Sequence, residues 1–241
     1  MGIGKIAGLI GLLGATWLQQ VDSGKLSLIE SAKQELTHFY PRGNDFQDVR
    51  TGREYLIPMS VMNEQEQWVR KALEDSRKND DYLIVVSKLE RRLDIFYDGE
   101  LVDRFPVALG LKVFEDKLYE RDRRTPEGVY KIVQKKDGVN IPTDYYKALL
   151  IDYPDLDDKR RFVENKEKGL IPNSVSGPGS LIEIHGQVPQ WRNFDTRWDW
   201  TSGCVGMMDR DIDFLFSKVN EGTFVVIVKA YHQGIRNQYK R

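Results

Sequence analysis

The sequence predicts an α+β protein, mainly β, in which a helical N-terminal region precedes a mostly antiparallel β domain. Apolar residues with helical spacing dominate residues 26–73, whereas short apolar runs separated by turn residues take over at Tyr82. A length of 241 residues is ample for a hydrophobic core. The shares of hydrophobic residues, 40%, and charged residues, 30%, are typical of a globular chain.

Composition narrows the function classes. The net charge is −1, with 36 basic and 37 acidic residues, and no basic block is interleaved with aromatic residues. Binding to nucleic acid is therefore not expected, and neither is bulk attraction to anionic membranes. One cysteine excludes an intrachain disulfide and a zinc site with several cysteines. Three scattered histidines and the lack of a glycine-rich phosphate loop indicate no metal and no organic cofactor.

The N-terminus carries one early positive charge, Lys5, followed by an apolar or small run over residues 6–18. This run is shorter than the about 20 residues that a transmembrane helix needs, and it fits the apolar region of a signal peptide. Ala15 and Ser23 are candidate cleavage positions, although neither has an A-x-A pattern. Residues 1–23 are thus interpreted as a signal peptide or an uncleaved membrane anchor, with a buried helix as the alternative. Export to the periplasm or cell envelope is expected.

Residues 24–79 are expected to be helical. Apolar positions over residues 26–39 have helical spacing, and a proline and a glycine end the segment. A second helix is predicted to begin near Asn63, whose spacing to Glu66 suits a capping box, and to run through Trp68, Ala72 and Leu73. These helices could pack on the β domain or recruit a partner, and the sequence leaves both open.

Short strands are predicted from Tyr82 onward. They cover residues 83–86 and 93–97, then 101–109 after an Asp98-Gly99 hairpin turn, and later residues 129–133 and 223–228. The charged stretch 115–124 is interpreted as a solvated loop. Residues 137–177 are interpreted as a surface loop with one amphipathic helix. A long segment of this kind can also act as a lid, with tyrosines that line a groove.

The stretch from His185 to Cys204 concentrates residues that carry chemistry. Cys204 is the only cysteine and lies 19 positions after His185, which ends a predicted buried strand. A thiol reacts as thiolate, so it needs a neighbouring base such as imidazole. Gly203 lets the backbone approach a substrate, and a helix capped by Asp209 follows, whose dipole favours a thiolate if the loop folds back. A single cysteine is more often inert core, but this pattern supports a Cys–His acyl-transfer site.

Three tryptophans, Trp191, Trp198 and Trp200, crowd the connection between His185 and Cys204. Such rings bury large areas, so packing under a loop is favoured over contact with a ligand. The chain ends in a basic tail, residues 233–241, which is typical of a frayed end.

The His185-Gly186 pair, followed by Thr201-Ser202-Gly203-Cys204, resembles the YkuD-type L,D-transpeptidases, which act on peptidoglycan stem peptides. Residues 124–130 look like the family's R-T-P-x-G-x-[FY] segment, and residues 178–184 look like the strand that leads into its His-Gly. These matches run in the family's order across about residues 82–229. The resemblance implies a mixed or antiparallel β-sandwich-like catalytic domain over residues 80–232, in which residues 124–128 shape the floor beside the site.

The resemblance also implies a mechanism. His185 takes the proton of Cys204, and the thiolate attacks the carbonyl next to a D-amino acid to form a thioester. The backbone carbonyl of Gly186 orients the histidine. Amides of Gly203 and Cys204, with Ser202, form the oxyanion hole. An amine from a second stem peptide, or water, then resolves the thioester.

The sequence departs from the commoner family pattern, [ST]-H-G-C-x-[RN], at two positions. Ser202 replaces the histidine, and Gly206 replaces the arginine or asparagine. The missing cation puts in doubt how a substrate carboxylate is held. Arg192 or Arg197 could substitute for it, and Tyr146 and Trp200 are further candidates for substrate binding.

Three other functions stay open. The first is an L,D-carboxypeptidase or amidase that hydrolyses stem-peptide or peptidoglycan–protein bonds. The second is a non-catalytic peptidoglycan-binding module. The third, a papain-like protease, is disfavoured because its cysteine precedes its histidine and it pairs that histidine with Asn or Asp. The sequence leaves the donor and acceptor peptides and the oligomeric state open.

Overall fold

The computed structural model describes residues 45–48, 50, 54–189 and 196–231. The predicted signal peptide or anchor, the predicted helix over residues 26–39 and the basic tail lie outside these residues. Within the described residues, no helix combines the length and the hydropathy needed to cross a membrane. The predicted domain boundaries at residues 23, 79 and 232 stay predictions.

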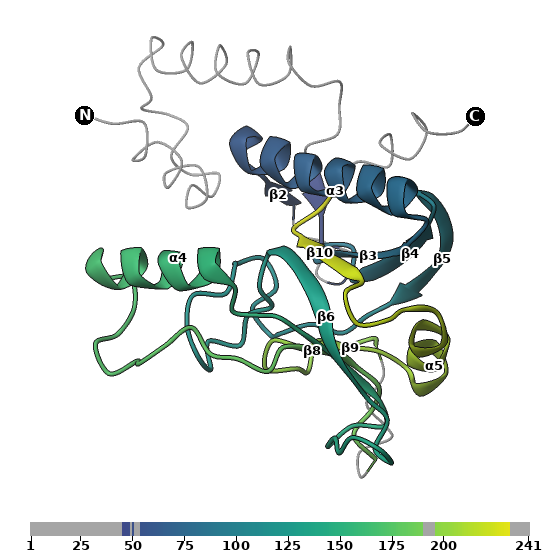
Figure 1. Ribbon diagram of the computed structural model, residues 1–241. Coiled ribbons are helices and arrows are strands. Elements are labelled where there is room, and N and C mark those ends of the chain that lie inside the picture. The colour runs from purple at the N-terminus through teal and green to yellow at the C-terminus, as the bar shows by residue number, and fades with distance from the viewer. Residues whose placement is uncertain (1–44, 49, 51–53, 190–195, 232–241) are drawn as a thin grey trace. The chain divides into compact units, whose positions relative to one another are not determined.

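The predicted class, α+β and mainly β, is confirmed (Figure 1). The helices are α3 (Met59–Asn79), α4 (Leu156–Glu167) and α5 (Asp209–Lys218). The strands are β1 (Asp45–Gln47), β2 (Glu54–Leu56), β3 (Tyr82–Ser87), β4 (Arg92–Tyr97), β5 (Glu100–Pro106), β6 (Gly128–Lys136), β7 (Ala148–Ile151), β8 (Glu183–His185), β9 (Val205–Gly206) and β10 (Phe224–Val228).

Strands β3 to β10 form one mixed sheet in the order β5-β4-β3-β10-β6-β7-β8-β9. The β10–β3 and β8–β9 pairs are parallel, and the other pairs are antiparallel. β6 belongs to both halves, since residues 128–131 pair with β10 and residues 132–136 pair with β7. The register shifts between Ile132 and Gln134, so the sheet curls along this long strand (Figure 1).

Side chains on the two faces of the central strands pack into two different hydrophobic clusters. In β3, Leu83 and Val85 pack with the α3 cluster, whereas Ile84 and Val86 belong to the larger cluster inside the curl. Successive side chains of a strand point to opposite faces, which explains this division. Both faces of β3 and β10 are therefore covered.

The predicted start of α3 near Asn63 is wrong. The helix begins four residues earlier, at Met59, and Asn63 lies inside it. Met62, one position before Asn63, is buried, so the buried stripe of the helix already begins before the predicted capping box. Pro58 precedes the first helical residue without a side-chain cap. Its fixed φ and missing N–H make it suitable for that boundary.

The predicted surface loop over residues 137–177 is also partly wrong. β7 lies within it and is an interior strand, paired with β6 on one side and β8 on the other. Three of its four residues are buried and the fourth is half-buried, so side chains on both faces of the strand are apolar. The sequence therefore shows no alternation of apolar and polar residues that would indicate a strand. The expected amphipathic helix is present as α4, with a capping box between Asp155 and Asp158.

The charged stretch 115–124 is a loop, as predicted, but it is only partly solvated: Glu120, Arg121 and Arg123 are exposed, whereas two other charged residues are not. Lys117 and Asp122 are buried, and their side chains form an ion pair at 2.8 Å. The Asp122 carboxylate also accepts hydrogen bonds from the backbone N–H groups of Leu118, Tyr119 and Arg124. Because these two charges are paired and hydrogen-bonded, this part of the segment can lie against the interior.

Candidate active site

Four strands of the sheet position the candidate residues. The registers align one row across β6, β7, β8 and β9, which consists of Lys136, Ala148, His185 and Gly206. The neighbouring row, Leu149, Ile184 and Val205, belongs to the hydrophobic cluster on the opposite face. Cys204 ends the turn that immediately precedes β9, the strand that pairs with the strand of His185.

His185 is held in one orientation. Its side chain is 0% exposed, and its ring stacks on Tyr145 with centroids 3.6 Å apart and planes at 15°. Nδ1 lies 2.7 Å from the carbonyl oxygen of Gly186. A carbonyl can only accept, so Nδ1 carries the proton and Nε2 carries a lone pair. Among the described residues, Nε2 has no hydrogen-bond partner.

The electrostatic state of His185 follows from its burial. Burial lowers its pKa from 6.5 to about 4, although the hydrogen bond to Gly186 acts in the opposite direction. The imidazole is therefore neutral near pH 7 and able to accept a proton at Nε2.

Cys204 is a free thiol that is partly exposed. Its Sγ lies 3.6 Å from the carbonyl oxygen of Leu181. Burial raises the pKa of the thiol to about 11, whereas a hydrogen bond from the Glu183 backbone and the charges of Lys117 and Lys136 lower it. The thiol and the imidazole are thus both neutral at rest, and within the described residues no hydrogen bond joins Nε2 to Sγ.

The expected help from a helix dipole is not supported. β9 follows Cys204 directly, and α5 begins only at Asp209. The dipole acts over about the first turn of a helix, and an extended strand separates the sulfur from that turn. Asp209 is also not the N-cap, which is Met208; its carboxylate accepts a hydrogen bond of 2.8 Å from the Gln187 backbone.

The turn before Cys204 is closed by hydrogen bonds of its own. The Thr201 hydroxyl donates to the Cys204 carbonyl at 2.7 Å, and the Gly203 N–H donates to the Thr201 hydroxyl at 3.2 Å. Gly203 has φ +140°, and a Cβ there would lie 2.6 Å from the carbonyl oxygen of Arg124. Only glycine fits this close approach, which brings the segment at residues 124–128 against the turn. The Gly203 amide is therefore already engaged, whereas Ser202 is exposed.

Trp200 covers the position where the commoner family pattern has a cation. A Cβ at Gly206 would lie 2.8 Å from the Trp200 ring. The same indole meets the His185 ring edge-on, with centroids 5.5 Å apart. The packing prediction is wrong for Trp198, whose side chain is 71% exposed, and Trp191 lies outside the described residues.

The residue before Trp200 is fixed by a buried charge network that the sequence did not reveal. Asp199 accepts a hydrogen bond of 3.0 Å from the Leu109 backbone. It also forms ion pairs with Arg91 at 3.0 Å and with Arg50 at 2.6 Å. These contacts join residues far apart in sequence, so no local pattern could indicate them.

The other predicted substrate-binding residues are Tyr146, Arg197 and Arg192, of which Tyr146 lies next to Gly186. The Tyr146 hydroxyl donates to Asp213 of α5 at 3.1 Å, and it is the neighbouring Tyr145 that stacks on His185. Arg197 is exposed, and Arg192 lies outside the described residues. No group of three or more metal-ligating side chains occurs in the described part of the chain.

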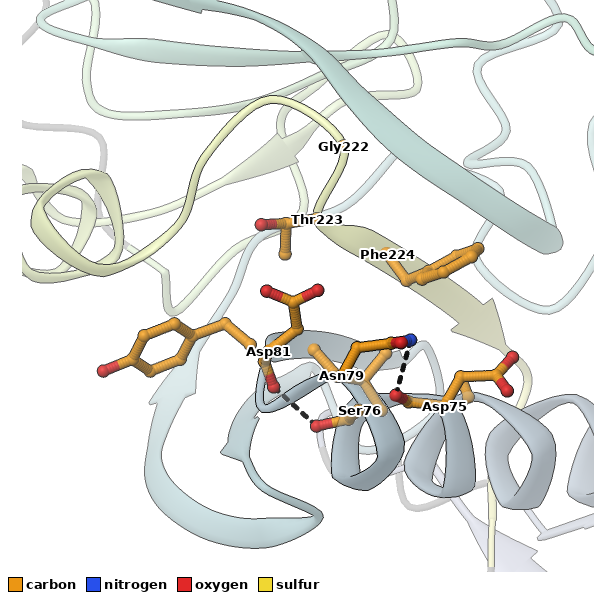
Figure 2. A pocket seen from close by; sticks show the side chains of 10 residues that line it. Asp75, Ser76, Asn79, Asp81, Gly222, Thr223 and Phe224 are labelled. Carbon is orange, nitrogen blue, oxygen red and sulfur yellow. Dashed lines mark hydrogen bonds between the residues drawn. The ribbon is translucent and has the colours of Figure 1, made fainter.

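A small pocket lies elsewhere, where α3 ends beside the start of β10 (Figure 2). Ser76 and Asn79 on its wall donate to backbone carbonyls of Asp81 and Asp75. Its volume of about 10 Å³ holds roughly one water molecule. None of the candidate residues lines it.

The fold is α+β with a curled mixed sheet, in which one strand ends at a buried histidine and the neighbouring strand begins directly after a free cysteine. The chain belongs to the YkuD family: the model of the L,D-transpeptidase catalytic domain matches residues 81–227. The family implies peptidoglycan peptides as substrates and association with the cell wall. No curated protein sequence matches the chain.

Several solved structures are similar to the chain. The helical cell shape determining protein Pgp2 from Campylobacter jejuni is 23% identical over 70% of this chain and 56% of its own, with a TM-score of 0.46. Bd1075 from Bdellovibrio bacteriovorus is 23% identical over 67% and 53%, with a TM-score of 0.43. An L,D-transpeptidase from Mycobacterium smegmatis is 16% identical over 61% and 58%, with a TM-score of 0.36. The chain thus spans just over half the length of each.

Proposed function

We propose that the chain is a peptidoglycan L,D-transpeptidase that acts on stem peptides through a thioester on Cys204. The observation that carries this proposal is the state of His185. Its Nδ1 is committed to the Gly186 carbonyl, and its buried Nε2 has no partner within the described residues, while Cys204 immediately precedes the strand that pairs with that of His185. Membership in the family supports the substrate class.

In the proposed first half-reaction, the Sγ proton passes to Nε2 of His185 while Sγ bonds to the carbonyl carbon of the donor peptide. The C–N bond to the following D-residue then breaks, and the leaving amine takes the proton from Nε2. In the second half-reaction, an acceptor amine attacks the thioester and expels the thiolate, which recovers its proton. Because the resting pKa values favour thiol and imidazole, proton transfer and attack are expected to be coupled.

We assign the oxyanion hole to the amides of Ser202 and Cys204. The Gly203 amide donates to Thr201 in the resting turn, so it could join them only by giving up that bond. Gly203 still serves the site, because its lack of a side chain allows the turn to lie against Arg124.

Trp200 is the proposed wall of the substrate site, since its ring covers Gly206 and contacts His185. Arg197 and Arg192 remain proposed partners of a substrate carboxylate, and Tyr146 remains a proposed groove residue. Export to the periplasm or cell envelope is proposed from the apolar N-terminal run together with the family's association with the cell wall.

Hydrolysis is the second candidate function. An indole over Gly206 takes the place where the commoner family pattern provides a cationic or amide side chain. Without that group, an acceptor peptide has one polar contact fewer, and water can resolve the thioester instead. The protein would then act as an L,D-carboxypeptidase or amidase through the same acyl-enzyme.

The test is incubation of the full chain with a disaccharide-tetrapeptide, alone and with an amine acceptor, beside Cys204→Ala. Products are followed by mass spectrometry. A new cross-link that the variant does not form is the expected result, whereas loss of the terminal D-residue alone indicates the hydrolase. Binding without any turnover, equal in wild type and variant, would contradict both and indicate a peptidoglycan-binding module.

A further inference from the structure

A buried ion pair lies on the same face of the sheet as His185. Lys136 ends β6 and lies in the row of His185, and Glu183 begins β8, two positions before that histidine. The Lys136 Nζ and Glu183 Oε1 atoms are 2.7 Å apart, and the two side chains are 16% and 8% exposed. Lys136 lies outside the segments that resemble the family, whereas Glu183 lies in the 178–184 segment, just before the His-Gly pair.

Glu183 is the strand neighbour of Cys204, since the next residue of each strand forms the Ile184–Val205 pair. Its backbone hydrogen-bonds the sulfur and lowers the pKa of the thiol, whereas its carboxylate charge raises that pKa. The Lys136 ammonium lowers it. The pair therefore places compensating charges beside the sulfur.

The other titratable groups that face Cys204 come from different elements. His185 lies on the same strand as Glu183, and Tyr145 precedes β7, with a pKa that burial and the Cys204 charge raise. Lys117 contributes from the 115–124 segment, where its ammonium is bound to Asp122. Lys136 is the cation that is paired directly with Glu183.

Burying two charges costs desolvation, so such a pair is weak support for stability. A lone carboxylate beside a nucleophilic sulfur would also oppose formation of the thiolate. We propose that Lys136 is a positioning residue of this site: by holding Glu183 in an ion pair, it prevents an uncompensated negative charge beside Cys204 as the thiolate forms. This inference rests on the proposed role of Cys204 as the nucleophile.

The test measures alkylation of Cys204, the only cysteine, by iodoacetamide in the full chain from neutral to alkaline pH. Lys136→Met leaves the Glu183 anion uncompensated and is expected to slow alkylation by about tenfold, the effect of one pKa unit. Glu183→Gln leaves the cation and is expected to accelerate it. The double variant removes both charges and is expected to return near the wild-type rate.

Two controls separate charge from packing. Lys135→Met changes the adjacent residue, which faces the other way and donates to the carbonyls of Phe216 and Val219. It is expected to alkylate at the wild-type rate. Lys136→Arg keeps the cation and is expected to do the same. If Lys136→Met does not fold, acceleration by Glu183→Gln still tests the proposal.

A wild-type rate in Lys136→Met, or a double variant as slow as Lys136→Met, would overturn the role of Lys136. Alkylation requires no peptidoglycan, so its outcome is independent of turnover. Failure to process stem peptides with the alkylation pattern intact counts against the proposed function. If the protein processes stem peptides but the variants do not show the expected alkylation rates, the proposed role of Lys136 is wrong.

Discussion

At the scale of single residues, the site depends on an imidazole that is buried in its neutral form. The folded-state pKa of His185, about 4, lies below its ordinary value of 6.5. Between these two values the unfolded chain binds the proton and the folded chain does not. The contribution of His185 to stability is therefore present above pH 6.5 and is lost as the pH falls toward 4.

We expect acid to destabilise the wild type more than His185→Gln. Relative to that variant, its free energy of unfolding should fall by up to about 3 kcal/mol between neutral pH and pH 4. Urea unfolding of both proteins at several pH values measures the difference. Parallel pH profiles would contradict a buried neutral histidine.

At the scale of an element, the turn at residues 201–204 decides where the sulfur lies. Gly203→Ala should destabilise the protein by roughly 1–3 kcal/mol, because a side chain at this φ is strained and meets the Arg124 carbonyl. Turnover should fall by about 100-fold, the effect of misplacing a reacting group by about 1 Å. Thermal unfolding and the stem-peptide assay measure the two effects.

The matched control for this turn is Gly177→Ala. A Cβ at Gly177 meets nothing within 4 Å, and this glycine is not among those with positive φ. The control should behave like the wild type. Equal effects of the two substitutions would contradict a specific fit of Gly203 against Arg124.

At the scale of the whole molecule, a buried charge cluster joins the α3 side of the sheet to the segment that carries Arg124. Lys88 is fully buried and donates to the carbonyls of Glu115 and Thr125 and to the carboxylate of Glu127. Glu127 also accepts from Lys229 and from Gln65 of α3. The described residues from Phe46 onward form one compact unit, and this cluster links distant parts of it.

Lys88→Met should lower the free energy of unfolding by about 3–5 kcal/mol, because it removes one partner of a buried pair and leaves two carbonyls unsatisfied. Urea unfolding measures the loss. Arg160→Met is the control, since the Arg160–Asp157 pair is exposed and should contribute less than about 1 kcal/mol. Similar losses of unfolding free energy in the two variants would show that the buried contacts of Lys88 contribute no more to stability than an exposed ion pair.

Local patterns predicted the elements that one short window of sequence determines. The hairpin at Asp98-Gly99 follows from turn chemistry, and both residues have positive φ in the structure. The helix after residue 208 follows from apolar spacing, and the family motifs indicated His185 and Cys204. Periodicity could not predict β7, because a strand that is buried on both faces shows no alternation.

The tertiary structure decided everything that depends on contacts between distant segments. Tyr145 rather than Tyr146 meets His185, and Asp199 fixes the loop of Trp200 through Arg91 and Arg50. Burial sets the pKa values of the thiol and the imidazole. The sequence by itself determined the fold class and most strands, because these depend on local spacing, and its family motifs indicated the two candidate catalytic side chains. Strand pairing and register are set only when the sheet folds, and folding also removes His185 and Cys204 from water. This desolvation determines the protonation states of the two side chains.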